Sequence, residues 1–108
     1  MNTEAKSPEV DGAIHTLHGR VGEEVIVVIR NGDDVSGDSV VAVMHGILSY
    51  TGREEGDLLF GVDHPDGSEM VASAFHIHPE RITETEIGRS LVAVTEGDVR
   101  IEVGTRVR

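Results

Sequence analysis

The sequence predicts an all-β fold, either a small antiparallel β-barrel or a compact sandwich of about six strands. Valine and isoleucine recur throughout the chain, whereas the aromatic residues are limited to Tyr50, Phe60 and Phe75. Such β-branched side chains favour strands over helices. Alternating apolar runs are separated by Gly, Asn and Asp at short intervals, which is typical of antiparallel hairpins. The length of 108 residues fits one domain.

The first twelve residues, MNTEAKSPEVDG, combine proline, glycine and charge without any period. This predicts a disordered N-terminal tail over residues 1–12 and a single β-domain over residues 13–108. The segment IHTL, residues 14–17, fits either a helical turn or a first edge strand.

The first hairpin is predicted around Asn31-Gly32. EVIVVIR, residues 24–30, is apolar on both faces, as in a strand that is covered on two sides. An Asn-Gly pair readily supplies the positive φ angles of a tight turn, so the chain should double back here. VVAVMHGILSY, residues 40–50, then forms a long strand in which Gly46 marks a bulge or a bend.

A second hairpin joins DLLFGV, residues 57–62, to EMVASAFHI, residues 69–77. With Phe60 opposite Val71, the residues on one face are Leu58, Phe60, Val62, Val71, Phe75 and Ile77. A slip by one residue would instead pair the first three with Met70, Ala72 and Ala74, and the sequence leaves both registers open.

Pro79 ends this strand, and PERITETEIG, residues 79–88, is either one short helical turn or a loop. A third hairpin follows in SLVAVTEGDVRIEV, residues 90–103, with its turn at Glu96-Gly97.

The residues Val25, Val27, Ile29, Asn31, Gly32, Val35 and Gly37 resemble the first half of an Sm-type motif, in which two curved strands meet at an Asn-Gly turn. This resemblance implies a small SH3-like or Sm-like barrel. Sm-like proteins contact RNA through a later Asp and a Met-Asn pair, whereas the aligned segment here reads VAVMHGIL. The resemblance therefore does not imply RNA binding.

Composition argues against nucleic-acid binding and excludes several other classes of function. Twenty acidic against nine basic residues give a formal net charge of -11, which repels a nucleic-acid backbone. The chain has no cysteine, and so no disulfide, thiolate metal site or thiol catalysis. Its longest apolar stretch, residues 40–48, is too short to cross a bilayer core of about 30 Å. Without an apolar N-terminal run, a cytoplasmic location is expected.

His76 and His78 are the strongest candidates for a site. An i, i+2 pair on a strand projects both imidazoles to one face, which suits a divalent metal ion. Further ligands would come from His45 or His64, or from Asp63 or Glu80. The alternative is that both histidines are solvated surface residues, because alternation turns Phe75 and Ile77 inward.

Other polar motifs have simpler explanations. The segment DHPDG, residues 63–67, is typical of a hairpin loop and lacks the ligand pattern of an EF-hand. The chain has no glycine-rich loop followed by lysine and no Gly-x-Ser-x-Gly elbow. The sequence therefore favours a non-enzymatic role without a cofactor.

Three functions remain open. The first is a protein-interaction module that self-associates through an edge strand or residues 40–50, because small chains often complete their cores by forming oligomers. The second is a metal-dependent binding protein or enzyme built on His76 and His78. The third is an acidic mimic of nucleic acid, as found among phage and mobile-element proteins.

Overall fold

A computed structural model describes residues 8–31, 40–54, 57–63 and 71–105 of the chain. It contains α1 (Pro8–Gly19), the short 3₁₀ helix η2 (Pro79–Arg81) and seven strands. The strands are β1 (Glu24–Asn31), β2 (Val40–Glu54), β3 (Asp57–Asp63), β4 (Val71–Ile77), β5 (Ile82–Ile87), β6 (Leu91–Glu96) and β7 (Val99–Thr105). They form one antiparallel sheet in the order β4-β3-β2-β1-β7-β6-β5. The all-β class is therefore confirmed.

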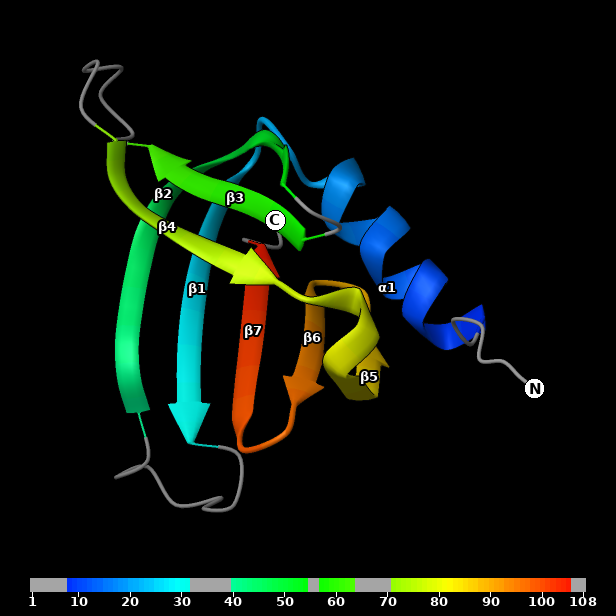
Figure 1. Ribbon diagram of the computed structural model, residues 1–108. Helices are drawn as coiled ribbons and strands as arrows, with labels where there is room; N and C mark the ends of the chain where they lie inside the picture. Colours follow the sequence, from blue (N-terminus) through cyan, green and yellow to red (C-terminus); the bar gives the residue numbers. More distant parts are fainter. Residues whose placement is uncertain (1–7, 32–39, 55–56, 64–70, 106–108) are drawn as a thin grey trace.

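The sheet is strongly curved but does not close. Figure 1 shows β3 and β4 crossing in front of β1 and β7, while α1 lies beside the curved sheet. The two edge strands, β4 and β5, are not paired with each other and are joined through η2. The structure is thus a single open sheet of seven strands, neither the closed barrel nor the two-sheet sandwich of about six strands expected from the sequence.

All three predicted hairpins are present. β1 pairs with β2, β3 with β4, and β6 with β7, each in antiparallel orientation. Gly97, with φ 59°, lies in the short connection after Glu96, where the turn was expected. β1 does end at Asn31, but the predicted turn at Gly32 lies outside the described residues.

The register of the second hairpin differs from the one assumed. Phe60 lies opposite Phe75 rather than Val71, and Leu58 lies opposite Ile77. Leu58, Phe60, Phe75 and Ile77 therefore do share the buried face, as predicted. The alternative pairing with Ala72 and Ala74 is excluded, because Gly61 lies opposite Ala74.

Two elements correct the sequence-based prediction. Residues 8–12 belong to α1, although a disordered tail was expected up to residue 12; residues 1–7 lie outside the described part. The helical reading of residues 14–17 is the right one. The turn predicted at Pro79 is real but only three residues long, and residues 82–87 form the edge strand β5.

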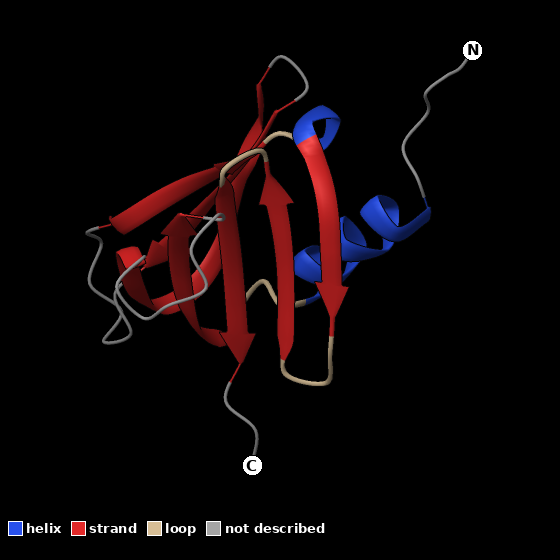
Figure 2. Ribbon diagram, turned by 90° about the horizontal axis from the view of Figure 1, so that it is seen from below, coloured by secondary structure: helices blue, strands red, loops and turns tan. Residues whose placement is uncertain are grey.

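The core lies on the concave face of the sheet. Its largest fully buried side chains include Phe60, Leu48 and Ile77 from β3, β2 and β4. Leu17 and Ala13 of α1 join the same cluster, so the helix covers part of the open sheet. Figure 2 shows α1 on one side of the strands, and its contacts are mainly with β5 and β6.

Gly46 allows two strands to pack closely and does not lie at a β-bulge. It pairs regularly with Val25, and the irregularities in β2 lie instead at Val41 and between Tyr50 and Gly52. A Cβ atom at position 46 would collide with the carbonyl oxygen of Asp63. The backbones of β2 and β3 therefore approach closely here because residue 46 has no side chain.

Within the described residues, no helix combines the length and the apolar character that crossing a membrane requires.

Candidate metal centre

His76 and His78 project from the end of β4 to the same side. Phe75 and Ile77 are buried, so alternation turns His76 outward. His78 follows the strand but keeps extended angles, φ -110° and ψ 92°. Proline disfavours the helical region for the preceding residue, so Pro79 helps to hold His78 in this conformation. The alternation of β4 thus continues for one more residue, as the sequence predicted.

Asp57 reaches these histidines from the neighbouring strand. Leu58 lies opposite Ile77, and the same register continued by one residue places Asp57 opposite His78. Side chains at directly opposed positions of an antiparallel pair project to the same face. The first residue of β3 therefore contributes a carboxylate to the side that carries both imidazoles.

The three side chains form a compact group of possible metal ligands. One ligand atom each from Asp57, His76 and His78 lies within 4.8 Å of the others. The His78 Nε2 and Asp57 Oδ2 atoms are 3.4 Å apart. Zinc bond lengths of about 2.0–2.2 Å place tetrahedral ligand atoms roughly 3.3–3.6 Å apart. Since His76 is exposed, its ring has room to turn toward the other two ligands.

Glu96 fixes the orientation of the His78 ring. Its carboxylate, at the end of β6, lies 2.8 Å from His78 Nδ1 and accepts a 3.0 Å hydrogen bond from the His78 backbone amide. The Glu96 side chain is only 9% exposed, against 26% for His78. A carboxylate that contacts one ring nitrogen leaves the other nitrogen available to bind a metal.

The additional ligands proposed from the sequence are not part of this group. His45 lies on β2 and contacts Glu24, with 2.6 Å between His45 Nε2 and Glu24 Oε2. Asp63 lies at the opposite end of β3 from Asp57, and Glu80 is exposed on η2. His64 lies outside the described residues.

Sequence reasoning missed both carboxylates of the site. Asp57 could have been found by pairing Phe60 with Phe75, since that register alone brings it opposite His78. No pattern in the sequence indicates that Glu96 belongs to the site. It approaches His78 because η2 connects β4 to β5, and Ile82 at the start of β5 pairs with Glu96.

A separate network of charges covers the outer face of β1, β7 and β5. Arg30 and Arg100 both donate hydrogen bonds to Glu102, and Arg100 also donates to Glu86. Burial raises the pKa of the Glu102 carboxyl, but these hydrogen bonds outweigh it, so the pKa lies below its usual value. The hydrogen bonds that Arg100 donates to Glu102 and Glu86 raise the pKa of the Arg100 guanidinium. Because its groups neutralise one another, we regard this network as structural.

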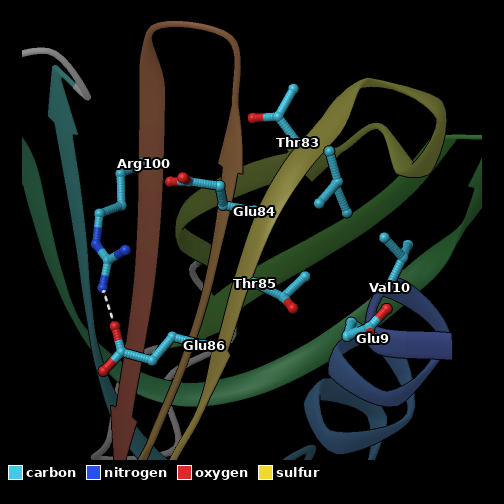
Figure 3. A pocket seen from close by; sticks show the side chains of 8 residues that line it. Glu9, Val10, Thr83, Glu84, Thr85, Glu86 and Arg100 are labelled. Atoms are coloured by element: carbon cyan, nitrogen blue, oxygen red, sulfur yellow. Dashed lines mark hydrogen bonds and ion pairs between the residues drawn. The ribbon is translucent and has the colours of Figure 1, made fainter. Parts of the chain in front are cut away.

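A cavity of about 500 Å³ lies between α1 and β5. Figure 3 shows Glu9 and Val10 on the helix, Thr83 to Glu86 on the strand, and Arg100 turned toward Glu86. The arginine is already paired, with Arg100 Nη2 2.7 Å from Glu86 Oε1. Three glutamates, two threonines and a paired arginine offer little to orient a ligand, so Asp57, His76 and His78 are the stronger candidate.

Compared with known proteins, the chain matches no protein-family description, no curated protein sequence and no solved structure.

Proposed function

We propose that this protein binds one divalent transition-metal ion, such as zinc, through Asp57, His76 and His78. The observation that carries the proposal is the position of the His78 imidazole between two carboxylates. Its Nδ1 atom is 2.8 Å from Glu96 and its Nε2 atom is 3.4 Å from Asp57. An imidazole oriented by a carboxylate is the arrangement found around many metal-binding histidines.

The ligand types indicate which ions suit the site. Two imidazoles and one carboxylate favour zinc and other first-row transition ions over calcium or magnesium, which prefer oxygen ligands alone. Three protein ligands leave at least one coordination position for water or for another molecule. The site therefore suits an ion with an exchangeable ligand better than a closed structural ion.

The charge of the protein also favours a cation. A formal net charge of -11 gives the surface a negative potential, which raises the local concentration of divalent ions. Charge alone gives no specificity. Specificity comes from the two imidazoles, whose positions at the end of β4 are set by strand alternation and by Pro79.

The test is zinc titration of the purified protein, with native mass spectrometry to count the bound ions. We expect one zinc ion per chain for the unaltered protein and a large loss of affinity for His76→Ala and for His78→Ala. His45→Ala is the matched control, because His45 also contacts a glutamate, Glu24, but lies outside the group. It should bind zinc like the unaltered protein.

Two results would contradict the proposal. One is the absence of stoichiometric zinc from the unaltered protein. The other is equal zinc affinity for His78→Ala and for the unaltered protein. In either case the contacts of His78 with Asp57 and Glu96 would have a structural role only.

Self-association is a second candidate function, supported by exposed apolar side chains on the outer face of β1 and β2. Ile26, Val41 and Val43 are 50%, 72% and 61% exposed. They lie on adjacent strands, with Val28 of β1 directly opposite Val43. Two chains of charge -11 repel each other, so a second copy would dock most favourably through these apolar side chains.

Sedimentation velocity across a concentration series tests this second candidate. The unaltered protein should form dimers, and Val43→Asp should be monomeric at the same concentrations. A strictly monomeric unaltered protein would refute self-association and would leave the metal proposal untouched.

The third possibility, a mimic of nucleic acid, has less support. Such a mimic needs a line of unpaired carboxylates, whereas Glu86 and Glu102 on the outer face are paired with arginines.

A further inference from the structure

A cavity of about 350 Å³ adjoins the candidate metal centre. His76, His78 and Glu96 form part of its wall, so the cavity and the candidate metal ligands share side chains. Its volume lies near the lower end of the range for small-molecule sites, about 300–1,000 Å³.

The rest of the wall is mainly apolar. Ile29 and Ile101 lie opposite each other on β1 and β7, and Phe75 and Val99 contribute further apolar surface. Ile101 and Phe75 are buried, whereas Val99 is 41% exposed. The cavity therefore lies beside the edge strand β4 and contacts the face of the sheet that carries Ile29 and Ile101. Cavities of this kind, apolar with a few polar groups, are typical of small-molecule sites.

The charges around the cavity select the kind of polar group that a ligand would carry. The carboxylates of Asp57 and Glu96 together offset the charge of a divalent ion. Arg81, which is exposed on η2, also lines the cavity. Among the described residues, its guanidinium has no ion pair or hydrogen bond. One positive charge thus remains for one anionic group.

We propose that the cavity binds a small monocarboxylate with an apolar body. The carboxylate would occupy the open position on the metal ion and lie near Arg81, and the apolar body would lie against Ile29, Val99 and Ile101. This inference rests on the proposed metal function. A polyanion such as a nucleotide fits less well, because the cavity offers one arginine in a protein of charge -11.

The experiment uses 4-methylpentanoate as the probe and the zinc-loaded protein as the receptor, with binding followed by two-dimensional NMR of the backbone amides. The matched probes are 4-methylpentanamide, which lacks the charge, and acetate, which lacks the apolar body. Native mass spectrometry of the same samples records the zinc content. The variants are Arg81→Gln and, as a control, Arg89→Gln, which changes an arginine that does not line the cavity.

We expect 4-methylpentanoate to bind with shifts at the amides of Ile29, Val99 and Ile101. Its affinity should be at least about tenfold higher than that of either matched probe. Arg81→Gln should weaken binding about tenfold, since a charge-assisted hydrogen bond is lost, and Arg89→Gln should leave it unchanged. Removal of zinc with a chelator should abolish binding.

Zinc-loaded protein that does not bind the probe, or that binds acetate equally well, would overturn this inference and leave the metal proposal standing. Unchanged binding by Arg81→Gln would overturn it in the same way. A protein that takes up no zinc would overturn both proposals, and the recorded zinc content separates that case from the others.

Discussion

The carboxylate of Glu96 accepts a hydrogen bond from the backbone amide of His78 and lies 2.8 Å from the Nδ1 atom of its ring. Glu96 belongs to β6, near one end of the open sheet, and His78 directly follows β4, the strand at the other end. This pair therefore ties together two regions that no strand pairing connects. The contact between Glu96 and His78 Nδ1 also leaves His78 Nε2 facing Asp57. The pair of Glu96 and His78 is therefore part of the proposed metal site.

Replacing Glu96 by Gln should lower the affinity for zinc about 10–100-fold, the usual cost of removing the carboxylate behind a metal-binding histidine. Gln keeps the size of the side chain but not its charge. Zinc titration at a temperature at which the variant is folded measures the effect. Glu80→Gln, which changes an exposed glutamate on η2, is the control and should bind zinc normally. Equal affinities for the two variants would show that Glu96 does not act on the metal through His78.

Zinc should also stabilise the fold, because its ligands come together only when β3 and β4 are paired. At a free zinc concentration of about 100 times the dissociation constant, an ion that binds only the native state adds about 2.7 kcal/mol. For a domain of this size that corresponds to an increase in Tm of roughly 10–20 °C. Differential scanning calorimetry with and without a chelator measures it. The increase should vanish in His76→Ala, and an increase that persists there would point to a different site.

The stability of the protein should fall in acid partly because of Glu102. The pKa of this carboxyl is depressed in the folded state by hydrogen bonds from Arg100 and Arg30. The network therefore stabilises the protein fully above the unfolded pKa, about 4.3. The stabilisation is lost as the pH falls below that value and through the folded pKa.

Glu102→Gln should cost about 1.5 kcal/mol at neutral pH and should show a smaller further loss on acidification. Urea unfolding between neutral pH and pH 3 measures both effects. Glu84→Gln, on exposed β5, serves as the control with an unaltered acid profile. A profile for Glu102→Gln that parallels that of the unaltered protein would contradict this assignment.

Gly46→Ala should destabilise the protein by about 1–3 kcal/mol, because the new Cβ would collide with the Asp63 carbonyl and force β2 and β3 apart. Gly12→Ala is the control. A Cβ at position 12 would make an ordinary 3.5 Å contact with Ile87 Cδ1, and alanine favours the interior of a helix. Gly12→Ala should therefore be neutral or stabilising. Equal free energies of unfolding for the two variants would refute the close approach at Gly46.

Much of the sheet could be predicted because its signals are local. The turn residues and alternating runs were sufficient to predict three hairpins and to place His76 and His78 on one side of a strand. The helix α1 has apolar residues at positions 10, 13, 14 and 17, the spacing of one helical face. The prediction of a disordered tail over residues 1–12 divides that pattern. β5 was missed because ITETEI, an edge strand, carries little apolar alternation.

The candidate site could be predicted only in part because it depends on contacts between strands. The His-x-His spacing is visible in the sequence, but Asp57 joins it only in the register that pairs Phe60 with Phe75. Glu96 joins it only because the curved sheet and η2 bring β6 beside the end of β4. Neither relationship follows from local periodicity, since a change of register by an even number of residues preserves the same alternation.

The most direct test of the metal proposal is a crystal structure of the zinc-soaked protein, with diffraction data collected on both sides of the zinc absorption edge. We expect one anomalous peak per chain, bonded to a carboxylate oxygen of Asp57 and to the Nε2 atom of His78, with a nitrogen of His76 as the third protein ligand. A fully occupied peak elsewhere, or zinc-soaked crystals with no peak between these three residues, would contradict it.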